Sequence, residues 1–277
     1  MPDETPIDEL ILCEVANGVA RVTINRPDAG NSLTAQMRDH LTDTFEELSA
    51  TLGVRAIVLT GAGERHFCTG AGLGGAQKPG PARPDGAPER ALGDVARMIR
   101  RGWQRLVASM LDCEKPIIAA VNGTAAGGGC NLVLAADLVL MADHARLIEV
   151  FVRRGIIPDA GGCYLLPRIV GPMRAKELMF FGDDLGAEDA HALGIANRVL
   201  PGSDLRAATD EWAGRLAKGP SKTIAMTKWL LNRSFESSRQ SAFEEEAYAQ
   251  ELVNATADSA EGLRAFAERR DPDFQGW

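Results

Sequence analysis

Hydrophobic positions along the chain follow two spacings that alternate with one another. Short continuous apolar runs at 56–59, 116–121 and 137–141 are typical of buried strands. Residues 10–25 instead alternate apolar and polar side chains around Asn17 and Gly18, which predicts two short strands joined by a tight turn. Strand-like and helix-like segments therefore interleave, and the sequence predicts an α/β protein.

Helical spacing occupies the stretches between these strands. Ser32 is a candidate N-cap for a helix with its apolar face toward the core, and Gly53 ends that helix. Residues 90–112 form a second helical stretch, whose expected inner face is Leu92, Val95, Ile99, Trp103, Leu106 and Met110. Two further helices are predicted at 173–181 and 187–193, with a short strand at 197–200.

The pattern changes near residue 200. From about 204 to 270 the spacing is helical, glycine is rare, and charged residues and alanine are frequent. We therefore predict an α/β core over residues 1–200 and a helical C-terminal region over residues 201–277.

A glycine-rich stretch follows the apolar strand at 116–121. Asn122 and Gly123 end that strand, and Gly127–Gly129 stand immediately before a short predicted helix at 132–136. Bare backbone at the start of a helix can approach a ligand closely, and its first N–H groups lack partners within the helix. The stretch predicts a site for an anion or a developing oxyanion. The alternative is a tight helix entry in which the glycines only relieve steric crowding.

A second glycine-rich stretch follows the strand at 56–60. Gly70, Gly72 and Gly75 formally match the spacing of a dinucleotide-binding loop, which must open a helix directly. Here the chain instead enters the proline-rich segment 76–88, which cannot be helical. We predict a lid or variable loop over 76–90, with a simple exposed insertion as the alternative.

Composition narrows the possible functions. The net charge of −8 disfavours broad binding to nucleic acid or to a membrane surface, and no apolar run reaches the length of a membrane span. Five scattered cysteines without a CxxC pair favour a reduced, cytoplasmic protein without a zinc site, and the acidic start lacks the features of a signal peptide. The four histidines are isolated in sequence, so we expect no bound metal; only His66 lies close to a glycine-rich stretch.

Several stretches together resemble the enoyl-CoA hydratase/isomerase, or crotonase, superfamily. The likeness covers essentially the whole chain and is carried by Ile24–Pro27, Phe67–Ala71, Asn122–Cys130, Gly155–Gly162 and Phe266–Phe274. The resemblance implies a crotonase-like spiral of ββα units with a C-terminal helical trimerisation region. It also implies an acyl-CoA thioester substrate and a homotrimer or homohexamer. No separate cofactor is expected, because coenzyme A is part of the substrate.

The resemblance also assigns residues to the site. The two backbone N–H groups that hold the thioester oxygen correspond to Ala71, after Gly70, and to Gly128, after Gly127. Removing a proton next to a thioester places negative charge on the carbonyl oxygen, and losing one positioned N–H donor typically slows such reactions about 10²–10³-fold. Candidate contacts for coenzyme A are Arg26, Phe266 and Arg269, although Asp28 stands where many relatives have a basic residue.

Hydratases of this family use two glutamates, whose positions here hold Asn131 and Phe151. Neither can act as a base, so both are assigned to the substrate-binding surface with Gly70 and Gly127. The carboxyl group that remains is that of Asp159, at a place where some isomerases and a dehalogenase of the superfamily carry their working aspartate. An apolar surround that includes Phe151 is expected to raise the pKa of Asp159 and make it a better base.

The sequence therefore favours a double-bond isomerase in which Asp159 moves a proton between two carbons. One alternative is a hydratase, for which Glu149 is the nearest candidate base, although Glu149 is more simply interpreted as a solvated or paired strand residue. A second alternative is an acyl-CoA-binding protein without catalytic activity. Asp159 could also cap its turn without taking part in chemistry. Cys68 and Cys130 lack an evident histidine partner and are interpreted as packing residues.

Overall fold

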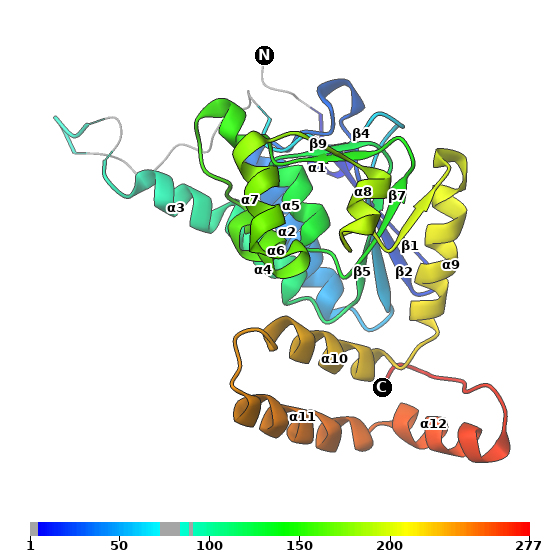
Figure 1. Ribbon diagram of the computed structural model, residues 1–277. Helices are drawn as coiled ribbons and strands as arrows, with labels where there is room; N and C mark the ends of the chain where they lie inside the picture. The colour runs from blue at the N-terminus through cyan, green and yellow to red at the C-terminus, as the bar shows by residue number, and fades with distance from the viewer. Residues whose placement is uncertain (1–4, 73–83, 89–90) are drawn as a thin grey trace.

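The computed structural model describes residues 5–72, 84–88 and 91–277 (Figure 1). Its main sheet has six strands, all parallel except the first. In spatial order they are β1 (Ile11–Ala16), β2 (Val19–Ile24), β3 (Ala56–Gly61), β5 (Ile117–Val121), β7 (Leu138–Ala142) and β10 (Arg198–Leu200). Strands β1 and β2 form a hairpin whose turn residues, Asn17 and Gly18, both have positive φ, as a right-twisted two-residue turn requires.

A second, smaller sheet has four strands. They are β4 (His66–Cys68), β6 (Thr124–Ala126), β8 (Arg146–Ile148) and β9 (Asp184–Gly186). The first three run parallel, and β9 is antiparallel to β8. Each short strand follows a strand of the main sheet along the chain or, for β9, precedes one. The chain thus passes repeatedly from the main sheet to the small sheet and on to a helix.

Helices close each turn of this path. In chain order they are α1 (Ile7–Leu10), α2 (Ala35–Ala50), α3 (Asp94–Arg101), α4 (Trp103–Leu111), α5 (Gly128–Leu134), α6 (Gly162–Val170), α7 (Pro172–Phe181), α8 (Ala187–Ala192) and α9 (Leu205–Ala217). Short 3-10 turns lie at Pro27–Ala29, Val150–Arg154 and Gly202–Asp204. The expected α/β architecture and spiral of ββα units are confirmed.

Four local expectations need correction. The cap of α2 is Thr34, whose side chain accepts from the N–H of Met37 at 3.2 Å, and not Ser32. The stretch 90–112 is two helices that meet at Gly102, and Leu92 and Val95 are exposed. Residues 146–152, expected from their apolar side chains to be extended throughout, are a three-residue strand followed by a 3-10 turn. Helix α6 begins at the end of the stretch 155–162, whose glycines and proline were expected to form a turn, and it contains Pro167.

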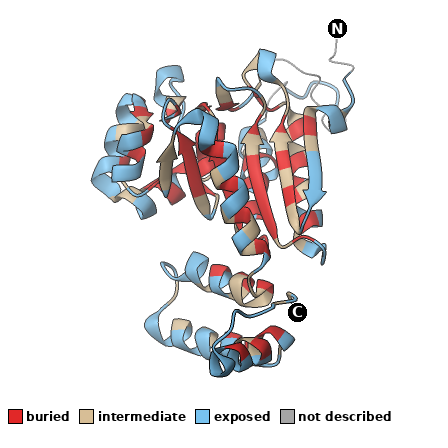
Figure 2. Ribbon diagram, turned by 90° about the vertical axis from the view of Figure 1, so that its right-hand side faces the viewer, coloured by how far each residue is buried: buried red, intermediate tan, exposed pale blue. Residues whose placement is uncertain are grey.

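The core lies between the main sheet and the helices that cover it (Figure 2). Every residue of β5 is buried, and β3 is buried except at Thr60, as expected for strands covered on both faces. Helix α9 packs against β3, β5 and β7, with Leu205 and Ala213 in the core. The predicted lid at 76–90 lies largely outside the described residues.

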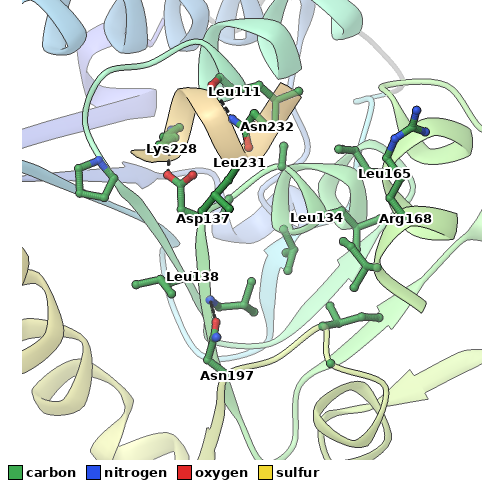
Figure 3. A pocket seen from close by; sticks show the side chains of 18 of the residues that line it. Leu111, Leu134, Asp137, Leu138, Leu165, Arg168, Asn197, Lys228, Leu231 and Asn232 are labelled. Carbon is green, nitrogen blue, oxygen red and sulfur yellow. Dashed lines mark hydrogen bonds and ion pairs between the residues drawn. The ribbon is translucent and has the colours of Figure 1, made fainter. Parts of the chain in front are cut away.

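Helices α10 (Ser221–Arg233), α11 (Arg239–Asn254) and α12 (Ala257–Glu268) stand below the rest of the molecule (Figure 1). Lys228 of α10 ties them to the core: its ammonium group reaches the Asp137 carboxylate at 2.8 Å and the carbonyl oxygen of Met110 at 2.9 Å (Figure 3). Large apolar side chains on these helices remain exposed, among them Phe243, Tyr248, Leu252, Leu263 and Phe266. In the part of the chain that the structure describes, no helix is long and apolar enough to cross a membrane.

Candidate functional site

The ends of β4 and β6 bring the two glycine-rich stretches together. Gly70 follows β4 and has φ +89°, a conformation that side chains rarely adopt. A Cβ atom on Gly70 would lie 2.9 Å from the carbonyl oxygen of Ala126 and 3.2 Å from the amide nitrogen of Gly128. The residue before Ala71 therefore touches the backbone at the start of α5, and both candidate amides belong to one small region.

The amide of Ala71 faces away from the strand-like bridge that holds its segment. The N–H of Leu33 donates to the carbonyl oxygen of Gly70 at 2.8 Å, and the carbonyl oxygen of Leu33 accepts from the N–H of Gly72 at 2.9 Å. In such a parallel bridge the N–H of the middle residue points to the other side. Among the described residues, neither the N–H of Ala71 nor that of Gly128 has an acceptor, so both are available to a ligand.

Apolar side chains surround the Gly128 amide. Three ring carbons of Trp103 lie 2.6–2.8 Å from the position that a Cβ of Gly128 would take, so the indole rests directly on this backbone. Phe151 is buried and packs beside Gly127. Trp103 was expected as part of a core face, and its contact with Gly128 could not be read from the sequence.

Helix α4 connects this amide with the segment of Asp159. Val107 lies four residues after Trp103 on α4, and its Cγ1 is 3.3 Å from the Cβ position of Gly161. Residues four apart share a helix face and are separated by a rise of about 6 Å. Helix α4 therefore packs against both the start of α5 and the loop of Asp159.

Asp159 is half-buried on the loop before α6. Burial raises the pKa of its carboxyl group, and the hydrogen bond from its own backbone N–H opposes this shift only in part. The expected direction of this pKa shift is confirmed. A carboxylate with a raised pKa is a stronger base than an exposed one.

Asn131 holds the backbone of this loop. Its side chain is fully buried on α5, one turn after Gly128, and its Nδ2 donates to the carbonyl oxygen of Asp159 at 2.8 Å. The N–H of Gly162 donates to the same oxygen at 3.0 Å. Asn131 was assigned to the substrate-binding surface, but this geometry makes it a support for Asp159. One helix thus fixes both the Gly128 amide and the loop of the candidate base.

Glu149 differs most from expectation. The residue is 4 % exposed, and among the described residues its carboxylate has no partner stronger than the weak thiol donor of Cys130, so it is neither solvated nor paired with a cation. Burial raises its pKa to about 7; the Asp159 charge adds to the shift, and the neighbouring Cys130 thiol opposes it. No sequence signal distinguished this glutamate from an ordinary strand residue.

Arg26 lies beside the Ala71 segment. Its Nη1 is 3.3 Å from the hydroxyl oxygen of Ser32 and 3.3 Å from the Cβ position of Gly72. Phe266 and Arg269 are not brought to this region within one chain, because both belong to α12 and its cap, in the helical layer below the core (Figure 1). The structure therefore unites Arg26, Gly70, Ala71, Gly127, Gly128, Asn131, Phe151 and Asp159, and leaves the two C-terminal residues apart.

The remaining candidate nucleophiles and bases do not complete this site. His66 pairs with Thr124 at the start of β4, the end opposite Gly70, and burial lowers its pKa. Cys68 is buried and its pKa is raised to about 12, while burial raises the pKa of Cys130 well above its ordinary value. Both thiols are therefore inert packing groups at neutral pH.

A separate groove of about 560 Å³ lies between α10 and the core (Figure 3). Its lining includes Asp137, Arg168 and Lys228, but none of the residues assigned to the glycine-rich site. The groove lies on the side of the molecule from which the C-terminal helices extend.

Comparisons with known proteins agree with this architecture. The family model described as enoyl-CoA hydratase/isomerase matches residues 14–277. A Rhodobacter capsulatus protein named "Probable enoyl-CoA hydratase" is 37% identical over 95% of this chain and 96% of its own. The Escherichia coli 1,2-epoxyphenylacetyl-CoA isomerase is 35% identical over 97% of this chain and 99% of its own.

Solved structures give the same result. The crystal structure of enoyl-CoA hydratase from Bacillus anthracis superposes with a TM-score of 0.86 at 30% identity, over 97% of this chain and all of that one. That of an enoyl-CoA hydratase/isomerase from Cupriavidus metallidurans gives 0.84 at 32% identity, over 97% of both chains. Matches of this extent, together with the spiral of ββα units, show that the chain belongs to the enoyl-CoA hydratase/isomerase family.

Proposed function

We propose that the protein is an acyl-CoA double-bond isomerase in which Asp159 carries the proton. The observation that carries this proposal is the place of Asp159: half-buried, on a loop that Asn131 ties to the helix beginning at Gly128. The positions at which hydratases of this family use glutamates hold Asn131 and Phe151. A single carboxylate suits a reaction in which a proton is removed and returned, with no water to activate.

The reaction would proceed in two steps, proton removal and proton return. The Asp159 carboxylate takes a proton from a carbon of a 3-enoyl thioester, and the electron pair of that C–H bond moves to the thioester oxygen as a dienolate. The N–H groups of Ala71 and Gly128 donate hydrogen bonds to this oxygen. Asp159 then returns the proton to the other end of the dienolate, and the conjugated 2-enoyl thioester forms.

The test is Asp159→Asn on a 3-enoyl-CoA substrate, followed by the absorbance of the conjugated product. Removing the proton carrier should lower kcat about 10²–10⁴-fold, because general-base catalysis typically contributes that much. Glu188→Gln, at an exposed position of α8, is the matched control and should retain full activity. Full activity in Asp159→Asn would remove Asp159 from the mechanism.

A hydratase is the second candidate function, and Glu149 is the observation that favours it. The site holds a second buried carboxyl group, and relatives such as the crotonyl-CoA hydratase of Syntrophomonas wolfei carry that name at 32% identity. A hydratase adds water to crotonyl-CoA, and the absorbance of the conjugated substrate disappears. An acyl-CoA-binding protein without activity would bind the thioester yet exchange none of its protons with deuterated solvent.

The exposed apolar side chains of α10–α12 support an assembly of identical chains. Phe243, Leu252 and Leu263 are each more than half exposed. Single exposed apolar residues are normal on a protein surface, but several large ones on adjacent helices indicate an interaction surface. We infer a homotrimer or homohexamer, which sedimentation equilibrium of the intact protein measures directly. A monomer at micromolar concentration would contradict this inference.

A further inference from the structure

Glu149 occupies an apolar enclosure. Its carboxyl group borders a small cavity of about 10 Å³ whose other walls come from α5, α6, α7 and both neighbouring strands of the small sheet. The apolar lining is Leu134, Leu147, Leu166, Leu178, Leu185 and Ile195. A charged carboxylate without a partner is strongly disfavoured in such surroundings, whereas its protonated form is not.

Among the described residues, the polar groups that act on Glu149 offer it no compensating positive charge. Cys130 and Asp183 line the same cavity, and Cys163 on α6 and Asp159 on the loop before α6 lie within electrostatic reach. The nearby Arg153 directs its guanidinium to Asp184 at 3.4 Å and to Asp183 at 4.0 Å. The acidic side chains of Asp159 and Asp183 near Glu149 therefore favour its neutral form.

We propose that Glu149 is a positioning residue that holds a proton next to the ionised Asp159, so that the two carboxyl groups together carry one negative charge. This inference rests on the proposed role of Asp159 as base. With Glu149 neutral, Asp159 is the group of the pair that accepts the substrate proton. Glu149 forms no bond to the substrate and loses no proton during the turnover.

The consequence is a specific dependence on pH. Once Glu149 ionises, a second negative charge stands beside Asp159 and holds the transferred proton on Asp159 more firmly. The return of that proton to carbon then slows. The value of kcat should therefore fall at alkaline pH as Glu149 ionises, and the titrating group that causes this fall is Glu149 and not a group of the substrate.

Infrared spectroscopy of the unliganded protein tests the protonation of Glu149 without any assay. The wild type should show the C=O band of a protonated carboxylic acid at about pH 6, and this band should vanish as the pH rises through about 7. Glu149→Gln should lack the band, Glu188→Gln should keep it, and Asp159→Asn should keep it with a lower midpoint. A band that is absent in the wild type, or unchanged in Glu149→Gln, overturns the inference whatever the enzyme's reaction is.

The pH profile of kcat tests the effect on catalysis. In wild type and Glu188→Gln, kcat should fall above neutral pH, whereas in Glu149→Gln the fall should be absent and the acid limb, set by Asp159, retained. An alkaline limb that survives unchanged in Glu149→Gln overturns the inference and leaves the isomerase proposal intact. The isomerase proposal fails separately: Asp159→Asn would then keep full activity, and the infrared result for Glu149 would be unaffected.

Discussion

Substituting Gly70 by alanine should separate the two candidate amides. The added methyl group would meet the carbonyl oxygen of Ala126 at 2.9 Å and the amide nitrogen of Gly128 at 3.2 Å, both closer than ordinary contacts. Backbone cannot move aside as a flexible side chain can, so the segments of Ala71 and Gly128 must shift apart. The hydrogen bonds that each donates to a thioester oxygen would no longer fit one acceptor.

The expected magnitude has two parts. Alanine at φ +89° costs about 1–2 kcal/mol of folding free energy from backbone strain alone. Loss of one oxyanion donor costs about 10²–10³-fold in kcat, or roughly 3–4 kcal/mol of transition-state stabilisation. Gly70→Ala should therefore lose far more activity than stability.

Gly194→Ala is the matched control. Gly194 has φ +81°, but no atom lies within 4 Å of its Cβ position, so alanine there brings the strain without the collision. Gly194→Ala should lose a few degrees of Tm from strain alone, and Gly70→Ala should lose at least as much because it adds the collision; only Gly70→Ala should lose kcat on a 3-enoyl-CoA. Full activity in Gly70→Ala, or an equal loss in both variants, would refute the assignment of this backbone to the site.

Three further predictions concern charge and support. Lys228→Met removes a buried cation from Asp137, whose side chain is 21 % exposed, and should lower the free energy of unfolding by about 1–3 kcal/mol in urea titrations, whereas Lys222→Met, at the exposed pair with Glu114, should lower it by less than about 1 kcal/mol. Glu149 has a pKa of about 7 in the folded state against 4.5 in the unfolded state, so between these values the folded state keeps a proton that the unfolded state has lost. The free energy of unfolding should therefore fall by roughly 3 kcal/mol as the pH rises from 4.5 to 7. Urea titrations should show this fall in the wild type and not in Glu149→Gln. Asn131→Leu removes the donor to the Asp159 carbonyl and should lower kcat on a 3-enoyl-CoA about tenfold or more with a smaller change in KM, because a base displaced by even 1 Å is less effective; an unchanged kcat would contradict the support role.

The alternation of apolar runs and helical stretches was sufficient to predict an α/β core, whereas the spiral of ββα units was expected only from the family resemblance. The strands at 56–59, 116–121 and 137–141 are recognisable because both of their faces are buried, so the apolar residues are continuous. The stretch 90–112 was misjudged because Gly102 interrupts the helix while apolar spacing continues on both sides. Helix α6 was missed because Gly161, Gly162 and Pro167 are turn-forming residues that here begin and interrupt a helix.

The candidate site was only partly predictable. The glycines before α5 marked a place where bare backbone is exposed, and the family resemblance then assigned the two amides to Ala71 and Gly128. The roles of Asn131 and Glu149 could not, since both depend on contacts between segments that are distant in sequence. Asn131 meets the carbonyl of Asp159, 28 positions away, and Glu149 is isolated by leucines from several elements. No local pattern reports whether a polar side chain finds a partner after folding.

Deuterium incorporation during the reaction tests whether two backbone amides stabilise an enolate while Asp159 moves the proton. A 3-enoyl-CoA incubated with the wild-type protein in deuterated water is analysed by mass spectrometry. We expect the conjugated isomer, with any deuterium confined to the two carbons between which Asp159 moves the proton. A product heavier by one molecule of heavy water, or 3-enoyl-CoA recovered unconverted and without deuterium, would overturn the proposal.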